Sequence, residues 1–304
     1  MIVLCFFITY FVWGSTYLAN VWAIREVPTY LLVATRFSIA GMLLLAIARI
    51  SAPVRATRPQ IRNCAVAGVL FFTLGNGLSI WSLNYIDSGL SAIIIALQPL
   101  IIVFVEWAAL KKRPNAGTVV GICLGLVGIA VLVEQPQFRS GAGPLLALAA
   151  LLAALTAWGI ATVWLPRADL PDSIFERVAL QMLFGSALLF IVSGSLGEFG
   201  DFELAKVTRR GVGSLVYLIV FGSLAAMTAF NYLLVKVPPT KVVTNTYVNP
   251  VIAVFLGWWL NNERVGWRTV VAAAFLLSGV YLIVRNKRRR TEEPAQADFE
   301  LVAD

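Results

Sequence analysis

The stretch GLSAIIIALQPLIIVF, residues 89–104, is apolar almost throughout but carries the pair Gln98-Pro99 in its middle. A second stretch, TKVVTNTYVNPVIAVF at residues 240–255, has an Asn-Pro pair at the corresponding position. Proline removes a backbone hydrogen-bond donor and crowds the preceding turn of a helix, so it is rarely placed inside a helix without a reason. Its recurrence in two similar stretches indicates an internal repeat.

Other pairs extend the repeat toward the start of each half. Trp13-Gly14 recurs as Trp158-Gly159, and ATRFSIAGMLLL is matched by ALQMLFGSALLF. A fixed self-similarity of this kind indicates a duplicated structural unit. We therefore predict a first half at 1–137, a second half at 138–285, and a charged tail at 286–304 that we expect to be disordered.

The composition indicates a membrane protein. The chain has 304 residues, of which 59% are hydrophobic and 13% are charged, whereas soluble domains carry about 25% charged residues. A spanning helix needs about 20 mostly apolar residues, and backbone groups in lipid must be satisfied within each segment. We predict ten spanning helices, at about 2–24, 31–48, 64–84, 88–110, 116–133, 144–165, 174–196, 212–234, 241–260 and 267–284.

Five predicted helices in each half have a topological consequence. Because five is odd, the second half enters the membrane from the opposite side to the first. The predicted fold class is therefore an all-α polytopic membrane protein made of two inverted-topology five-helix repeats, a construction that many secondary transporters share.

The basic residues follow the predicted topology. The net charge is +8, and the loops on the side of the N-terminus, together with the tail, hold more than twice as many Lys and Arg as the opposite loops. This positive-inside bias places both termini in the cytoplasm. The charge is thereby explained without a nucleic-acid partner.

The residue types make an enzyme or a metal centre a poor interpretation. The sequence has no His, and Cys5, Cys64 and Cys123 lie in three different predicted spans without the spacing of a metal site. No nucleophile motif or Gly-rich phosphate loop is present. We expect no cofactor, no bound metal and no catalytic activity.

Two segments resemble a known family. WGSTYLAN (13–20), with the ATRFSIAGMLLL that follows it, is similar to an EamA-type domain, as is TYVNPVIAVFLGWWLNNERVGW (246–267). The resemblance is to the drug/metabolite transporter superfamily and covers the chain up to about residue 286. It implies ten helices, a central cavity, and export of small metabolites such as amino acids, driven by an ion gradient or by exchange.

The chain departs from the family in two places. The family's Glu shortly after the ninth helix is present as Glu263, but the first half has Lys112 at the corresponding position. The family often has a Glu before the Pro of the ninth helix, where this sequence has Asn249, with Gln98 in the fourth helix. A mechanism that needs a carboxylate beside the Pro is therefore not supported by these residues.

The first helix carries the strongest candidate binding face. Tyr10, Trp13 and Tyr17 recur at helical spacing on one side. Trp13 falls near the middle of its span, although Trp in membrane helices normally lies at the interfaces. We interpret this face, with Trp158 of the other half, as substrate-binding. The alternative is helix packing, with Gly14 admitting a neighbouring helix.

Amide side chains within the spans complete the predicted binding site, because they can hydrogen-bond a substrate. An alternative for each is a hydrogen bond to another helix. The candidates are Asn76, Gln98, Asn231, Asn245 and Asn249.

The two prolines, Pro99 and Pro250, are predicted to act as hinges, since a kinked helix with freed carbonyls can bend or line a cavity. A purely structural kink is the alternative.

Ionisable residues inside spans are candidate coupling residues. Glu106 lies two turns beyond Gln98, where it could carry a proton, or it could snorkel and pair with Lys112. Arg36 lies inside the second span, where it could attract a carboxylate-bearing substrate or bind helix-end carbonyls.

Together these patterns favour a secondary transporter in the cell (inner) membrane that exports small amphipathic metabolites through a central cavity. The alternative is a non-transporting membrane factor for assembly or lipid handling. The expected partners are a small-molecule substrate and the lipid bilayer, with the protein a monomer or weak homodimer.

Overall fold

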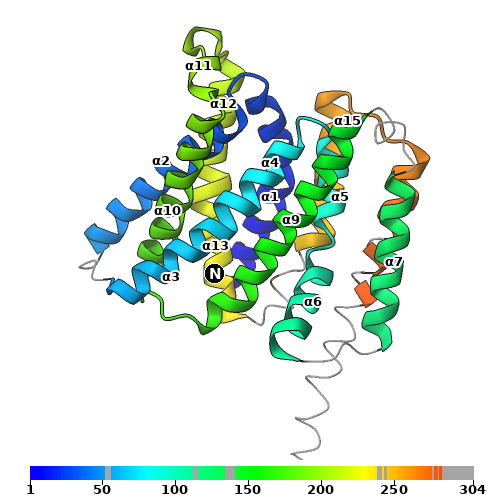
Figure 1. The fold of residues 1–304 in the computed structure, drawn as a ribbon, viewed down its shortest axis with the longest axis horizontal. Helices are drawn as coiled ribbons and strands as arrows, with labels where there is room; N and C mark the ends of the chain where they lie inside the picture. Colours follow the sequence, from blue (N-terminus) through cyan, green and yellow to red (C-terminus); the bar gives the residue numbers. More distant parts are fainter. Residues whose placement is uncertain are drawn as a thin grey trace, which may run out of the picture.

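The computed structural model describes residues 1–51, 56–111, 116–133, 141–237, 242, 245–275, 277–279 and 281–282. Within these ranges the regular elements are all helical (Figure 1), as the all-α membrane class predicts. The predicted disordered tail at 286–304 lies outside the described residues.

The first half contains α1 (Ile2–Ile24), α2 (Thr29–Ser51), α3 (Arg58–Gly68), η1 (Val69–Gly77), α4 (Leu78–Ser82), α5 (Ser88–Ile95), α6 (Gln98–Leu110) and α7 (Ala116–Val133). The second contains α9 (Ala142–Trp164), η2 (Leu165–Arg167), α10 (Ile174–Ser195), α11 (Glu198–Asp201), η3 (Leu204–Lys206), α12 (Arg209–Tyr217), η4 (Leu218–Ala225), α13 (Ala226–Lys236) and α15 (Asn245–Asn261).

Seven helical segments of the described chain are long and apolar enough to cross a membrane. Two shorter apolar helices follow, at Val248–Asn261 and Trp267–Gly279. The seven are Ile2–Ile24, Thr29–Ser51, Arg58–Ser82, Ser88–Ala109, Ala142–Arg167, Ile174–Ser195 and Arg209–Leu234.

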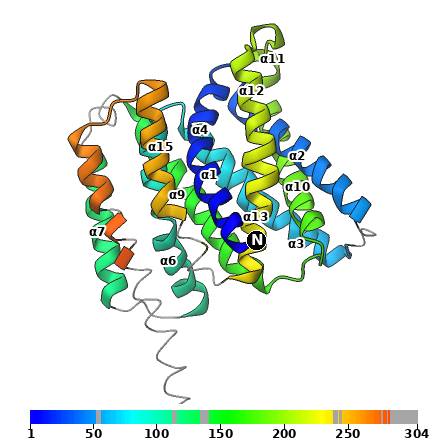
Figure 2. The same ribbon diagram turned by 180° about the vertical axis from the view of Figure 1, so that it is seen from behind.

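Helices from the two halves alternate in the bundle. α2 packs along α10, and α1 packs against α15, α13 and α12; the rear view shows α1 between α15 and α13 (Figure 2). On the other side, α9 packs against η1, α4 and α6. The centre of the molecule is therefore built from both halves.

A close backbone contact lies between α10 and α3, another pair that joins the two halves. A Cβ on Gly185 of α10 would lie 2.6 Å from the Gly68 carbonyl oxygen of α3. This distance is too short for a side chain, so the position requires glycine. Small residues allow helices to approach this closely in membranes, where van der Waals contact rather than the hydrophobic effect drives association.

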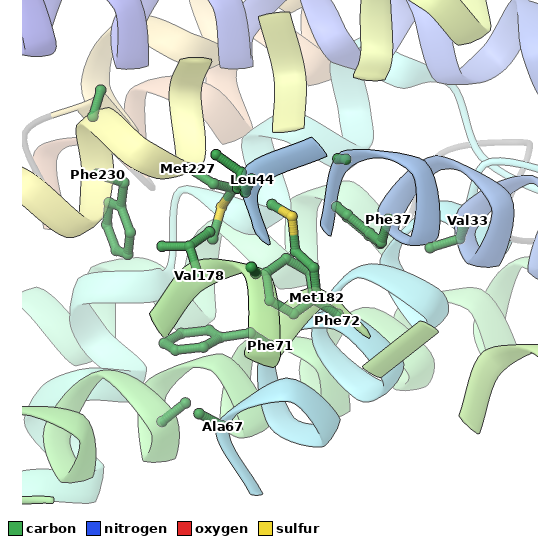
Figure 3. Close-up of a cluster of buried hydrophobic side chains, with 14 of the residues drawn as sticks. Val33, Phe37, Leu44, Ala67, Phe71, Phe72, Val178, Met182, Met227 and Phe230 are labelled. Carbon is green, nitrogen blue, oxygen red and sulfur yellow. The ribbon is translucent and has the colours of Figure 1, made fainter. Parts of the chain in front are cut away.

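The largest buried apolar cluster lies where α2, η1, α10 and α13 meet (Figure 3). Phe37 and Phe72 pack edge to face with ring centroids 4.6 Å apart, and Met182 is fully buried beside them. Phe71 and Phe230 belong to the same cluster. This cluster supports one wall of the site described next.

Two departures from regular α-helix occur near that site. A break at residues 96–97 separates α5 from α6, and the Gln98-Pro99 pair begins α6. The segments η1 and η4 are π-helices, one in each half. Such segments are rare, usually shorter, and frequent at functional sites.

Candidate substrate cavity

A cavity of about 150 Å³ lies between the two halves. Its wall includes residues of α1, α2, η1, α4, α5, α6, α9, η4, α13 and α15. The predicted site residues on this wall are Trp13, Tyr17, Arg36, Asn76, Gln98, Trp158, Asn245, Asn249 and Pro250.

Aromatic rings form one side of the cavity. Trp13 and Trp158 meet edge to face with ring centroids 6.1 Å apart, and Phe230 lies 5.1 Å from Trp13. A Cβ on Gly75 would lie 3.0 Å from the Trp158 ring, so the glycine of η1 makes room for the indole. The repeated Trp of the sequence thus belongs to a single aromatic wall.

Gly14, the residue after Trp13, packs against a neighbouring helix. A Cβ on Gly14 would lie 2.8 Å from Cβ of Ile252, so the absence of a side chain at Gly14 lets α1 and α15 approach closely. The packing role considered for this segment therefore applies to Gly14, while Trp13 lies on the cavity.

Amide side chains hold the surrounding helices together. Gln98 Nε2 donates to the Leu155 carbonyl at 3.1 Å, joining the start of α6 to α9. With its amide nitrogen turned toward the neighbouring acceptors, Asn249 donates to the carbonyls of Tyr10 (2.8 Å) and Asn245 (3.2 Å). These amides both line the cavity and bond to the protein.

The two π-helices place polar groups in a matching way. Asn76 Nδ2 donates to the Phe71 carbonyl at 2.9 Å, and Ser223 Oγ donates to the Leu218 carbonyl at 3.0 Å. In each case the acceptor is five residues earlier. The side chains thus satisfy carbonyls that the wider helical turn exposes.

Arg36 lies deep in this site. It is 4% exposed, its Nε donates to Ser223 Oγ at 2.8 Å, and its Nη1 donates to Asn20 Oδ1 at 3.4 Å. The guanidinium carbon also lies 4.8 Å from the centroid of the Phe37 ring. Among the described residues its acceptors are side chains of other elements, rather than the helix-end carbonyls considered above.

Four predicted site residues are not on the cavity wall: Tyr10, Pro99, Glu106 and Asn231. The Tyr10 ring packs on Phe6 at 5.7 Å, and Asn231, which is buried, donates to the Met227 carbonyl of its own helix at 3.0 Å. Glu106 is half-buried on α6. The alternative partner of Glu106, Lys112, lies outside the described residues.

Several cavity residues have no clear signal in the sequence. Ser79, Ser91, Gly222 and Met227 all line it, and the Ser91 hydroxyl is buried without a hydrogen-bond partner in the described chain. Ser91 lies seven residues before Gln98, two helical turns away, and this spacing could have pointed to it. The π-helical segment that presents Gly222 leaves no comparable pattern.

Carboxylates join the two halves at the end of the molecule where α11 and the start of α12 lie (Figure 1). Glu198 accepts the backbone N–H groups of Tyr30 (3.1 Å) and Leu31 (2.8 Å) at the start of α2. Such charges offset the positive end of a helix dipole.

Two further acids do the same for other helices. Glu263 accepts Ser88 Oγ (2.6 Å) and the N–H of Gly89 (3.1 Å) at the start of α5. Glu26 accepts the hydroxyl and the N–H of Thr208, both at 2.7 Å, and these hydrogen bonds hold the pKa of Glu26 below its ordinary value. Burial raises the pKa of Asp87, and the negative charge of Glu263 raises it further.

The described residues contain no group of three His, Cys, Asp or Glu side chains arranged to hold a metal ion. What the cavity offers instead is an aromatic wall, several amides and one guanidinium.

Comparison with known proteins shows which family shares this architecture. The sequence matches the EamA-like transporter family over residues 1–134 and again over 145–285. It is 29% identical to the uncharacterized inner membrane transporter YedA of Escherichia coli (strain K12), covering 96% of this chain and 93% of that protein. It is 21% identical to the uncharacterized transporter YoaV of Bacillus subtilis (strain 168), covering 89% and 92%.

A crystal structure with 19% sequence identity has the same fold, with a TM-score of 0.66 over 95% of this chain and 98% of that one. The two sequence matches extend over nearly the whole chain, and the helices are those of a multi-pass membrane protein. The chain therefore belongs to the EamA-like transporter family of the drug/metabolite transporter superfamily, and it is a membrane transporter.

Proposed function

We propose that this chain is a secondary transporter of the inner membrane that exports small amphipathic metabolites, such as amino acids or related compounds, by alternating access. The observation that carries the proposal is the central cavity, to which each half contributes a Trp from the same position of its repeat. Its mixture of apolar surface and a few polar groups is typical of small-molecule sites.

The proposed architecture is ten spanning helices in two inverted repeats, at 1–137 and 138–285, with both termini cytoplasmic. The two separate family matches support the repeat, as do the paired π-helices. Exchange of conformation between two inverted repeats supplies an outward-open and an inward-open state.

In this proposal Pro99 and Pro250 are the hinges, and Glu106 and Arg36 take part in coupling. The break between α5 and α6 supports a hinge at Pro99. Pro250 lies inside α15, where its missing N–H leaves a carbonyl one turn earlier without its helical partner. We expect the protein to work as a monomer or weak homodimer.

The test is transport by the purified protein in liposomes, offered a panel of radiolabelled amino acids, organic acids, amines and sugars. We expect uptake or exchange of at least one small metabolite above protein-free liposomes, and its reduction by Trp13→Ala. If no compound of a broad panel moves, the alternative of a non-transporting membrane factor is favoured.

A further inference from the structure

Arg36 is the charged residue on the described part of the cavity wall, and burying its charge there costs solvation free energy. Ionisable groups within spans are rare, and they usually pair with another charge or mark a substrate path. Arg36 is 4% exposed, so most of its hydration has been lost. A buried cation is tolerated when an anion or several hydrogen bonds replace that water.

No carboxylate of the protein supplies that anion within the described residues. The residues that line the cavity include no Asp or Glu. Of the acids inside spans, Glu176 accepts the N–H of Ala56 beyond the end of α2, and Glu106 is not on the cavity wall. Among the described residues, the cavity wall therefore holds no carboxylate that would neutralise the guanidinium.

The neighbours of Arg36 orient it without using all its donors. Of five N–H groups on an arginine, one donates to Ser223 and one to Asn20. Nη2 lies 2.9 Å from the point where a Cβ on Gly222 would be, so the glycine of η4 leaves space for the guanidinium. The remaining N–H groups have no acceptor among the described residues, in a planar fork that matches a carboxylate.

The aromatic side of the wall suits an apolar group. The same space is lined by Trp13, Trp158, Phe230 and Met227. Because the described wall carries no acid, an ammonium group there would find no ion pair. A cavity of about 150 Å³ accepts a molecule of about the size of benzene.

We propose that Arg36 is a carboxylate-binding subsite and that the cavity takes small organic monoanions, with the carboxylate on Arg36 and the apolar body on the aromatic wall. This inference rests on the proposed transport function and narrows its substrate class from amphipathic metabolites in general to organic monoanions.

Three probes that share one ring test the charge preference: benzoate, benzamide and benzylamine, titrated into the purified protein in nanodiscs by calorimetry. A hydrogen bond to a charged group favours benzoate over the amide by about tenfold or more in Kd. Equal or tighter binding of benzamide or benzylamine overturns the subsite, as does the absence of detectable benzoate binding.

Variants then assign the preference to Arg36. Arg36→Gln should weaken benzoate binding about tenfold or more while benzamide binding changes little. The matched control is Arg177→Gln, which removes another arginine within a span; Arg177 bonds to the Pro171 carbonyl and is not on the cavity wall. Arg36→Lys should keep part of the preference, because the charge remains but the fork is lost.

A second variant keeps the test decisive if Arg36→Gln does not fold. Gly222→Ala keeps the arginine in the sequence but adds a methyl group 2.9 Å from Nη2. The guanidinium must then shift, so the preference for benzoate over benzamide should fall. If the folded variants retain the full preference, Arg36 is a structural residue and the proposal is wrong.

Transport assays distinguish a failure of the anion subsite from a failure of the proposed transport function. If liposomes containing the protein carry neutral or cationic metabolites but no carboxylates, the protein is a transporter and the anion subsite is wrong. If benzoate binds through Arg36 but no compound is transported, the subsite stands and the proposed transport function fails.

Discussion

Two neighbouring residues of α1 have different roles, lining the cavity and packing against a helix, which the sequence alone did not assign. Trp13 lies on the cavity, and Gly14 lies against Ile252 of α15. The repeat of Trp13 at Trp158 predicted that both would reach the centre, and the structure brings their rings to 6.1 Å. A repeated position is informative because both halves build the same central space.

Other residues could not be placed from their type. Asn76 and Asn231 are both amides inside apolar spans, yet Asn76 lines the cavity and Asn231 does not. Each donates to a carbonyl of its own helix. The two amides are alike in residue type and apolar context, so the sequence does not distinguish their positions.

The aromatic wall yields a prediction at this scale. Trp13→Ala should weaken binding or turnover of a transported substrate about tenfold or more, because it removes a large apolar ring from the cavity wall. Initial rates in liposomes measure it. Trp259→Ala is the control, since Trp259 is 62% exposed on α15; equal effects of the two changes would remove Trp13 from the site.

Glu106 carries the prediction for coupling. If transport is driven by protons, Glu106→Gln should abolish the response to a pH gradient and retain exchange of substrate for substrate, because the amide cannot titrate. Uptake is compared with and without an imposed gradient. A variant that still concentrates substrate would make Glu106 structural and leave coupling to another ion or to exchange.

At the scale of elements, the two Pro motifs are alike in sequence and different in structure. Around Pro99 the span is divided into α5 and α6, whereas Pro250 lies inside the single helix α15. The proline ring excludes the same hydrogen bond in both. The proline alone therefore does not determine whether the helix is divided, and the motif does not predict it.

In the π-helices, α-helical periodicity does not predict which side chains share a face. Thr73 and Asn76 would share a face of an α-helix, but in η1 Thr73 donates to the Gly185 carbonyl of α10 at 2.9 Å while Asn76 lies on the cavity. A segment with i to i+5 hydrogen bonds turns its side chains by a different angle. Sequence patterns based on 3.6 residues per turn therefore fail there.

The carboxylates that cap helices across the halves give a stability prediction. Glu198→Gln should lower the free energy of unfolding by about 1 kcal/mol, because the amide retains an acceptor but loses the charge at the start of α2. The apparent Tm of the purified protein reports the change. Glu203→Gln is the matched control, since its pair with Lys206 is exposed and worth little; equal shifts would contradict the capping role.

At the scale of the whole molecule, composition and apolar runs were enough to predict a helical membrane protein, because the bilayer restricts backbone structure so strongly. The same rule does not determine how helices pack. The contact of α2 with α10, and of α1 with α15, joins segments far apart in the chain, and side-chain shape decides such pairs.

The orientation in the membrane is a prediction of the charge distribution. Single cysteines at Lys111 and at Glu203, in a background that lacks Cys5, Cys64 and Cys123, should lie on opposite faces. An impermeant thiol reagent added to intact cells should label the second and not the first. Labelling at Lys111 would reverse the proposed topology.

Alternating access to the cavity is the central claim, and the accessibility of Ser91 tests it most directly. Ser91 is a fully buried residue on the cavity wall, so Ser91→Cys in the same cysteine-free background places one thiol in the proposed path. A small impermeant thiol reagent should react with it from either face of the membrane, in right-side-out and in inside-out vesicles, and a transported substrate should slow both reactions. Reaction from one face only, in vesicles that still transport, would contradict the account.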